Sequence, residues 1–337
     1  MKPAADSNLR VSVIVCTHNP RPAYLGAVAD ALRQQKLDVA RWELLVVDNA
    51  SKKRVADWLN VAWHPQGRIL REEELGLTHA RLRGIRDATA NLLVFVDDDN
   101  VLAPDYLQAA LDLADRHPSL GIWSGRIDLE FETPPPEWTR KYWPFLVQRL
   151  VEREEMTQVM RLEEPLPVGA GLCVRREVAL AYAAAARTSR LRSSLGRCGV
   201  SLGSSEDTDM AMLACGLGWQ RGVFPQLRVR HLIPPERATE DYLVRLTEGI
   251  LFSSFVVKVL HQIKVVPPPI NTWWRLKYVC DLATKFGRKR RFYQAAKRAQ
   301  RRSRKLYEEL ALDEARSTPA PKPSATPEAA KESGTPS

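Results

Sequence analysis

The chain has 337 residues, 45% of them hydrophobic, so it is long enough to bury a sizeable core and to form one large domain with an extension. Its formal net charge is +10, but residues 275–305 contain thirteen Lys or Arg residues and one acidic residue. This distribution excludes a protein that is basic over its whole surface and assigns the basic character to one C-terminal segment.

The five cysteines are irregularly spaced and include no CxxC pair, which predicts neither a disulfide framework nor a zinc site. The N-terminus lacks the apolar stretch of a signal peptide, and no run approaches the ~18 apolar residues of a membrane-spanning helix. We therefore expect a cytoplasmic protein, either soluble or held peripherally on the inner face of the cell membrane.

Three apolar runs in the first hundred residues have the composition of buried strands. They cover residues 11–16, 44–47 and 92–96. Helical patterns separate them, the first over residues 24–35. This alternation predicts an α/β fold with a Rossmann-like, mostly parallel central sheet and helices on both faces.

Each of these strands gives way to polar residues, at 17–19, 48–51 and 97–100. Ligands of parallel sheets bind in the crevice at the carboxyl ends of the strands. We therefore expect the three polar clusters to converge on one crevice.

Further along the chain the pattern predicts strands at 121–131 and 166–175 and helices at 176–186 and 206–217. Residues 133–145 have the composition of a loop rich in proline and aromatic residues. The loop contains the aromatic residues Trp138, Tyr142 and Trp143, and the glycines Gly169 and Gly171 follow it in the sequence. Aromatic rings and exposed backbone suit binding of a sugar acceptor, and the rings could equally form a local hydrophobic cluster.

The C-terminal part divides at prolines. After Pro234 and Pro235 the composition is helical, and residues 236–312 form the predicted basic, helical extension. Residues 1–10 and 313–337 are predicted tails, the second disordered because its Pro, Ala, Ser, Thr and Lys residues bury little apolar surface.

Asp97, Asp98 and Asp99 directly follow the third predicted strand. Crowded carboxylates raise one another's pKa unless a cation or hydrogen bonds compensate. Oxygen ligands suit Mg²⁺ or Mn²⁺, which bind between one or two protein carboxylates and substrate phosphates. The triplet therefore predicts a divalent metal site, with a solvated acidic loop as the alternative.

Four other polar residues allow two interpretations each. Asp48 follows a buried strand and either binds a nucleobase or ribose or forms a turn. Glu206 and Asp207 begin an apolar helix. They either cap its N-terminus, or one of them acts as a general base. His231 follows a strand-like run and is either a packed or capping residue or a ligand.

Five segments stand in a distinctive order: VSVIVCTHN (11–19), VVDNAS (46–51), GLTHARLRGIRDATANLLVFVDDDN (76–100), GAGLCVRRE (169–177) and SEDTDMAMLACGLGWQRGVFPQLRVRHLIP (205–234). This order and spacing resemble those of family 2 glycosyltransferases of the GT-A fold. The resemblance covers residues 11 to about 235 and implies that 11–235 is a GT-A catalytic domain.

For the donor nucleotide, the resemblance implies that Thr17 and Asn19 lie against the base and that Asp48 contacts uracil or its equivalent. Arg81 would lie near the diphosphate or the base, and Asp98 close to the ribose or sugar.

For the metal and the reaction, Asp97 and Asp99 match the two acids of the DxD motif and would bind the metal. Asp207 matches the catalytic base of the family's ED motif, with Glu206 supporting it or touching the acceptor. His231 falls where some members supply a third metal ligand.

The activity implied by the resemblance is inverting transfer of a hexosyl group, dependent on Mn²⁺ or Mg²⁺. The donor would be a nucleotide-diphosphate sugar, with UDP-sugars favoured, and the acceptor a hydroxyl of a glycan or lipid-linked molecule. The sequence lacks the QxxRW motif and flanking membrane helices of processive members, so we expect transfer of a single sugar. A catalytically silent partner of a polysaccharide assembly complex and a nucleotidyltransferase are the alternatives.

Residues 273–305 combine aromatic and basic side chains. This composition is typical of a helix at an anionic membrane surface. A solvated helical face is the main alternative, and nucleic-acid binding is a less favoured one.

Overall fold

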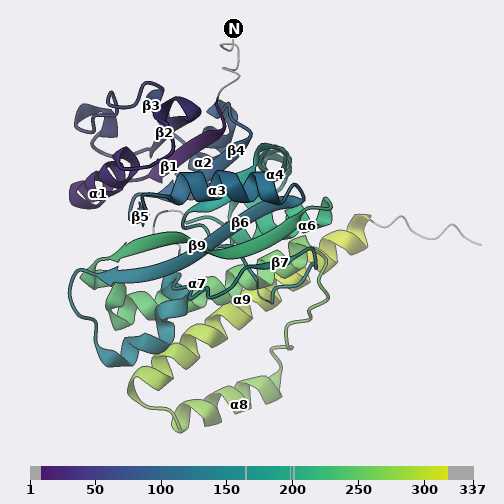
Figure 1. Cartoon of the computed structure of the whole chain (residues 1–337). Helices are drawn as coiled ribbons and strands as arrows, with labels where there is room; N and C mark the ends of the chain where they lie inside the picture. The colour runs from purple at the N-terminus through teal and green to yellow at the C-terminus, as the bar shows by residue number, and fades with distance from the viewer. Residues whose placement is uncertain (1–8, 164, 198, 200–201, 318–337) are drawn as a thin grey trace, which may run out of the picture.

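The computed structural model describes residues 9–163, 165–197, 199 and 202–317. Most of the predicted N-terminal tail and residues 318–337 of the predicted disordered tail lie outside these ranges. Sequence patterning located the main strands and helices, and the predicted α/β architecture with a C-terminal helical extension is confirmed (Figure 1).

The described residues form a nine-stranded sheet in the order β3, β2, β1, β4, β8, β6, β9, β5, with β7 paired to β9. Its parallel half consists of β1 (Val11–Thr17), β2 (Trp42–Asn49), β3 (Gly67–Glu72) and β4 (Leu92–Asp97). Its mixed half consists of β5 (Asn100–Leu102), β6 (Leu120–Phe131), β7 (Glu155–Thr157), β8 (Leu172–Arg175) and β9 (Gln220–Ile233). The parallel run ends at β4 because β8 pairs with it in the antiparallel direction.

Helices cover both faces of the sheet. Successive side chains of a strand point to opposite faces, and on the central strands both sets are apolar and need to be buried. Val13 and Val15 of β1 belong to one hydrophobic core and Ile14 to the other. The first core includes α1 (Pro22–Arg33) and α3 (Tyr106–Arg116), and the second includes α2 (Leu77–Asp87), α4 (Arg176–Thr188) and α6 (Glu206–Gly216). Short helical turns complete the domain: η1 (Val39–Arg41), η2 (Val55–Asp57), α5 (Arg190–Ser193) and η4 (Pro235–Ala238).

Three helices form the C-terminal part: α7 (Glu240–Leu260), α8 (Thr272–Ala283) and α9 (Gly287–Ser317). In Figure 1, α7 and α9 lie side by side beneath the mixed half of the sheet, and α8 lies at the outer edge. Leu243 and Leu246 of α7 pack against Leu146 and Ile233, which joins this part to the sheet. None of the helices in the described ranges has the length and apolar composition needed to cross a bilayer.

Two segments differ from the sequence predictions. Most of the proline-rich segment expected to be a loop forms a 3₁₀ helix, η3 (Glu137–Leu146), in which Trp143 donates a hydrogen bond to Thr139 and packs against Phe131. Helix α9 continues to Ser317, five residues beyond the predicted end of the extension. Tertiary contacts of the aromatic side chains stabilise η3, and a local pattern does not report such contacts.

His64 provides a pH-dependent contribution to stability. Its ring is buried edge-on against Trp42, 4.1 Å between centroids, and Nδ1 accepts the Gln66 amide hydrogen. Burial lowers the pKa of His64 to about 4, from an ordinary value of 6.5. Between these values the unfolded state binds the proton and the folded state does not. The contribution of neutral His64 to the free energy of unfolding is therefore fully present above pH 6.5 and decreases as the pH falls toward 4.

We expect the free energy of unfolding, measured in urea, to be about 2 kcal/mol lower at pH 5 than at pH 7, and this decrease to depend on His64. The His64→Gln variant should lose most of this difference, whereas His79→Gln, a change on the surface of α2, should retain it. An equal pH dependence in wild type and His64→Gln would contradict the assignment.

Candidate active site

The acidic triplet lies where β1 and β4 end side by side. Parallel pairing sets Cys16 opposite Asp97, so Thr17 comes next to Asp98. The Thr17 hydroxyl donates a 2.5 Å hydrogen bond to Asp98 Oδ2. Thr17 and the three aspartates line the same cavity. The resemblance assigns Thr17 to the nucleotide base, and in the structure its hydroxyl bonds to the triplet.

Strand pairing also brings Asp99 to His231, although 132 positions separate them in the sequence. Asn100 of β5 stands opposite His231 of β9, and the Leu232 amide donates to the Asp99 carbonyl. His231 Nε2 lies 3.4 Å from Asp99 Oδ2. Its Nδ1–H donates to the Leu146 carbonyl at 3.0 Å, which fixes the ring with Nε2 on the side of Asp99.

Arg237 supplies positive charge at this pair. Its Nη1 donates to Asp99 Oδ2 at 2.7 Å and lies 3.3 Å from His231 Nε2. Burial alone would raise the pKa of Asp99, but His231 and Arg237 outweigh it and hold this pKa well below its usual range. Asp98 accepts from the neutral Thr17 hydroxyl, and burial together with the charge of Asp99 raises its pKa to about 7 despite Thr17 and Arg237.

Arg81 of α2 joins the triplet to the start of α6. It is 3% exposed, forms an ion pair with Glu206 Oε1, and lies 3.5 Å from Asp97 Oδ1. The other Glu206 oxygen accepts a hydrogen bond from Thr78 at 2.8 Å. Burial still raises the pKa of Glu206, and Arg81 and Thr78 only partly oppose the shift.

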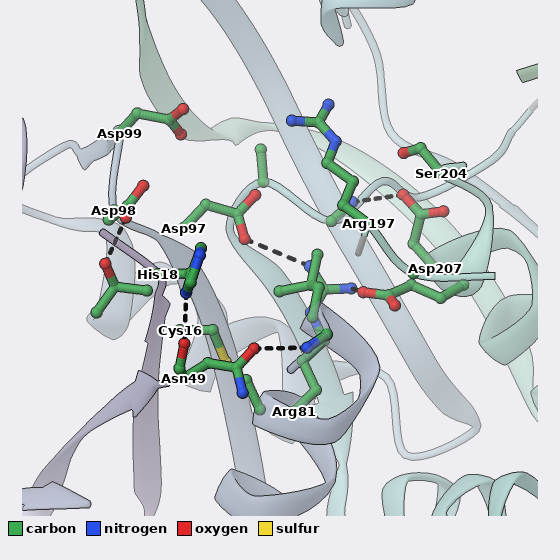
Figure 2. Close-up of a pocket in the computed structure, with 18 of the residues that line it drawn as sticks. Cys16, His18, Asn49, Arg81, Asp97, Asp98, Asp99, Arg197, Ser204 and Asp207 are labelled. Atoms are coloured by element: carbon green, nitrogen blue, oxygen red, sulfur yellow. Dashed lines mark hydrogen bonds and ion pairs between the residues drawn. The ribbon is translucent and has the colours of Figure 1, made fainter. Parts of the chain in front are cut away.

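Asp207 lies across the cavity from the triplet (Figure 2). Its Oδ2 accepts the Gly169 amide hydrogen and its Oδ1 that of Thr208, both at 2.7 Å. A Cβ atom at position 169 would lie 2.8 Å from Arg81 Nη2, so a larger residue there would displace the Arg81 guanidinium. The two hydrogen bonds fix the orientation of the Asp207 carboxylate.

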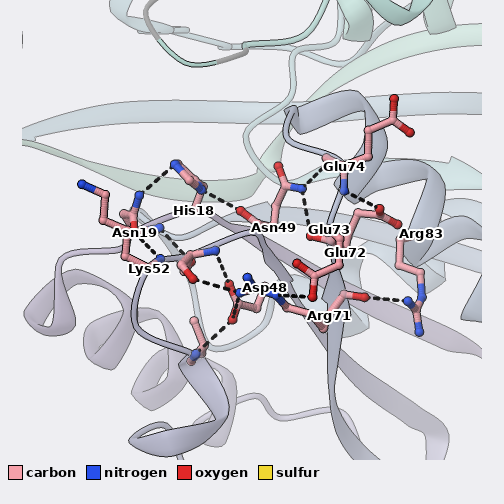
Figure 3. Close-up of polar contacts among 12 residues, drawn as sticks. His18, Asn19, Asp48, Asn49, Lys52, Arg71, Glu72, Glu73, Glu74 and Arg83 are labelled. Atoms are coloured by element: carbon pink, nitrogen blue, oxygen red, sulfur yellow. Dashed lines mark hydrogen bonds and ion pairs between the residues drawn. The ribbon is translucent and has the colours of Figure 1, made fainter.

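Asp48 and Asn19 do not line this cavity (Figure 3). The Asp48 carboxylate is buried and accepts hydrogen bonds from the Ser51 and Val55 amides at 3.1 Å and from Arg71 at 2.9 Å. Asn19 accepts the Lys52 amide hydrogen. The structure therefore shows both residues holding the loop after β2, and direct contact of either with a nucleotide base stays a prediction.

The neighbours of these two residues do line the cavity. His18 donates through Nδ1 to the Asn49 carbonyl at 2.6 Å. The Asn49 side chain accepts the Gly76 amide hydrogen at 2.8 Å and donates to the Glu74 carbonyl at 2.7 Å. Asn49 thereby fixes the turn that leads into α2 and Arg81.

Most of the cavity residues come from the carboxyl ends of β1, β2 and β4, the first turns of α2 and α6, and the end of β9, and the loops before β8 and α6 and the turn η4 supply others. The family model described as glycosyl transferase family 2 matches residues 12–181, which is half of the chain and contains the first three of these strands. The chain belongs to glycosyl transferase family 2.

Curated relatives of this family 2 glycosyltransferase match parts of it. An uncharacterized glycosyltransferase of Haemophilus influenzae is 29% identical over 112 residues, 33% of this chain and 37% of that protein. The uncharacterized protein y4gI of Sinorhizobium fredii is 29% identical over 144 residues, 39% of this chain and 15% of that protein. The matches thus span well under two thirds of the length of either relative.

Solved structures share the fold over almost the whole chain. A mannosyltransferase from Pyrobaculum calidifontis, in complex with GDP-Man and Mn²⁺, superposes with a TM-score of 0.53 at 20% identity, covering 92% of this chain and 82% of the other. Residues 1–349 of Staphylococcus aureus TarS, in complex with UDP-GlcNAc, give 0.51 at 13% identity, covering 90% and 92%. At these identities the likeness establishes the GT-A fold of the family 2 enzyme, its C-terminal part included.

The predicted metal ligands of this glycosyltransferase are only partly brought together. Across the described ranges, no three His, Cys, Asp or Glu side chains are grouped closely enough to hold a metal ion. Asp99 and His231 face one another, while Asp97 pairs with Arg81. One carboxylate and one imidazole fit a divalent cation that takes its other ligands from substrate phosphate and water. The orientation of His231 Nε2 toward Asp99 and the ion pair of Asp99 with the Arg237 guanidinium support this fit.

Sequence reasoning missed two cationic residues of the cavity, Arg197 and Arg237. Arg237 follows His231 by six residues, and η4 turns the chain back so that its guanidinium reaches Asp99. A basic residue after a Pro-Pro pair is too common to signal this contact. Arg197 lies in a loop without a recognisable pattern, and Figure 2 shows its side chain between the triplet and Asp207.

The buried Arg81–Glu206 pair should make the two residues interdependent. Arg81→Met leaves Glu206 buried without its cation, and we expect a loss of about 3–5 kcal/mol in the free energy of unfolding, measured in urea. The double variant Arg81→Met/Glu206→Gln should recover much of this loss. Arg83→Met, on the same helix but half-exposed in its pair with Asp87, should cost no more than about 1 kcal/mol. Additive effects of the two substitutions would rule the coupling out.

Proposed function

We propose that this family 2 glycosyltransferase transfers one hexosyl group from a nucleotide-diphosphate sugar to a hydroxyl of a glycan or lipid-linked acceptor, with inversion at the anomeric carbon. UDP-sugars are the favoured donors. The main support is a single cavity with the acidic triplet on one side and the hydrogen-bonded carboxylate of Asp207 on the other (Figure 2).

Asp207 is the proposed general base. Its carboxylate takes the proton of the acceptor hydroxyl while the hydroxyl oxygen forms a bond to the anomeric carbon. The bond from that carbon to the diphosphate oxygen breaks on the opposite face, and the nucleoside diphosphate leaves with the electron pair. The amides of Gly169 and Thr208 hold the base in place, and the N-terminus of α6 favours its negative charge.

The leaving diphosphate requires positive charge on the other side of the cavity. Arg81, Arg197 and Arg237 line the cavity and can supply this charge. A Mn²⁺ or Mg²⁺ ion, when bound, neutralises charge that develops on the leaving diphosphate. Asp99 and His231 would hold it, and Asp97 is a third candidate ligand that would have to turn from Arg81.

Donor recognition is assigned to the side of the cavity formed by β1 and β2. Thr17, with His18 and Asn49, supports binding of the nucleotide there, and Asp98 lies within reach of a ribose or sugar hydroxyl on the same side. The neighbours solved with UDP-GlcNAc and GDP-Man support a nucleotide sugar as donor without favouring one base.

We also propose that the enzyme works in polysaccharide biosynthesis in the cytoplasm, at the inner face of the membrane when its acceptor is lipid-linked. The cysteines in the described ranges are free thiols, and those at 16, 173 and 215 are buried, which is consistent with a reducing compartment. Nucleic acid is not among the proposed partners.

Removal of the base separates chemistry from binding. Asp207→Asn should lower turnover by ~10²-fold or more, because it removes proton abstraction, while donor affinity stays near that of wild type. Turnover is measured as release of nucleoside diphosphate, and affinity by calorimetry. Asp112→Asn, a change at an exposed acid of α3, serves as the control and should keep wild-type turnover. Unchanged turnover in Asp207→Asn would exclude Asp207 as the base.

Metal dependence is tested with candidate UDP- and GDP-sugars in the presence of Mn²⁺. We expect release of UDP or GDP that EDTA abolishes and that Asp99→Ala lowers by at least tenfold, since a metal supplies several kcal/mol of charge stabilisation. A nucleotidyltransferase would release pyrophosphate instead. A catalytically silent partner would bind a donor, seen as a higher melting temperature, and release nothing.

A further inference from the structure

The outer face of α8 exposes apolar side chains. Trp273, Leu276 and Val279 are 70%, 55% and 62% exposed, and Phe286, just beyond the helix, is 75% exposed. The spacing of three residues places the first three on one side of the helix. Trp273, Leu276 and Val279 thus form an apolar face of α8, which differs from the isolated apolar residues common on protein surfaces.

The inner face of α8 is fastened to α9. Trp274 is buried, stacks on Tyr278 with 5.5 Å between centroids, and donates a hydrogen bond to Gln300 at 3.1 Å. Tyr278 in turn lies parallel to Tyr293, whose hydroxyl donates to Asp281 at 2.5 Å. These contacts fix α8 through its inner face. The apolar face on the opposite side is therefore already formed and could bind a partner without rearrangement of the helix.

Unpaired positive charge surrounds this apolar face. Residues 272–290 contain six basic residues and one acidic residue. Arg275 and Lys277 flank the face on opposite sides at about 100° per residue, and Lys289 and Arg290 are exposed at the start of α9. In the described part of the chain, none of these four has an ion-pair partner within 4.0 Å.

The basic residues farther along α9 have a different role. Arg291 pairs with Glu240 at 3.0 Å, and Arg298 pairs with Glu248 at 2.6 Å, so their charge is balanced by α7. Phe292 stacks on Tyr142 with 4.2 Å between centroids, inside a hydrophobic cluster. Much of the segment whose composition indicated membrane binding therefore serves packing within the protein.

We propose that the outer face of α8 docks on an anionic lipid surface, with Trp273, Leu276 and Val279 at the level of the acyl chains. Arg275 and Lys277 lie beside the apolar face, where long basic side chains reach anionic headgroups. A second copy of the chain would bring like charge to the same place, and nucleic acid would leave the apolar side chains in water. Helix α8 lies at the edge of the molecule, with α7 and α9 between it and the sheet, so the surface is accessible (Figure 1). The proposal does not depend on sugar transfer.

The test is co-sedimentation of the full chain, without donor, with phosphatidylcholine vesicles that contain or lack phosphatidylglycerol. Wild type should bind the anionic vesicles and not the neutral ones, and 0.5 M salt, which shortens the Debye length to about 4 Å, should weaken binding. Leu276→Ser/Val279→Ser should reduce the partition coefficient by at least tenfold. The matched control is Leu180→Ser/Leu217→Ser, which removes two leucines that are 45% and 54% exposed on α4 and just after α6.

Three results would overturn the proposal. The first is equal vesicle binding by the outer-face variant and the control variant. The second is no binding of wild type to the anionic vesicles; a dimer, seen by analytical ultracentrifugation, that Leu276→Ser/Val279→Ser dissociates would then assign the face to a second copy. The third is binding to single-stranded RNA without binding to vesicles. Donor binding measured in parallel keeps a failure here distinct from a failure of the proposed activity.

Discussion

The carboxylates of Asp97, Asp98, Asp99, Glu206 and Asp207 line one cavity, and their mutual repulsion is the constraint on which its construction depends. Arg81 and Arg237 offset that repulsion at two separate points, Glu206 and Asp99. The triplet is divided as a result: Asp97 turns to Arg81, Asp99 to Arg237 and His231, and Asp98 to the neutral hydroxyl of Thr17. Adjacent residues of one type thus have different partners and differently shifted pKa values.

The position of the candidate site could be predicted from the sequence because buried strands are easy to detect and their carboxyl ends are polar. The runs before Thr17 and Asp97 are continuous and apolar, and the sheet had to bring their ends together. Asp207 joins the same cavity through the start of α6. Its hydrogen bond to Gly169 was not predictable, since it depends on how two loops approach.

Cations were harder to predict than acids. Arg237 was missed because a turn of η4 decides where its guanidinium points. Composition grouped the basic residues of α8 and α9 together, yet Arg291 and Arg298 are neutralised by α7 while Arg275 and Lys277 are not. Charge counted along a sequence does not distinguish paired from unpaired residues, because the partner lies on another element.

The pairing of β5 with β9 has a consequence for how the chain tolerates change. Asn100 stands opposite His231, so the three-residue strand β5 aligns the imidazole with the end of the triplet. Inserting or deleting one residue between Asp99 and Leu102 would turn successive side chains to the opposite face of the sheet and separate Asp99 from His231. Length variation in this short stretch is therefore far more damaging than in the surface loops, and homologous enzymes that keep this pair must also keep its spacing.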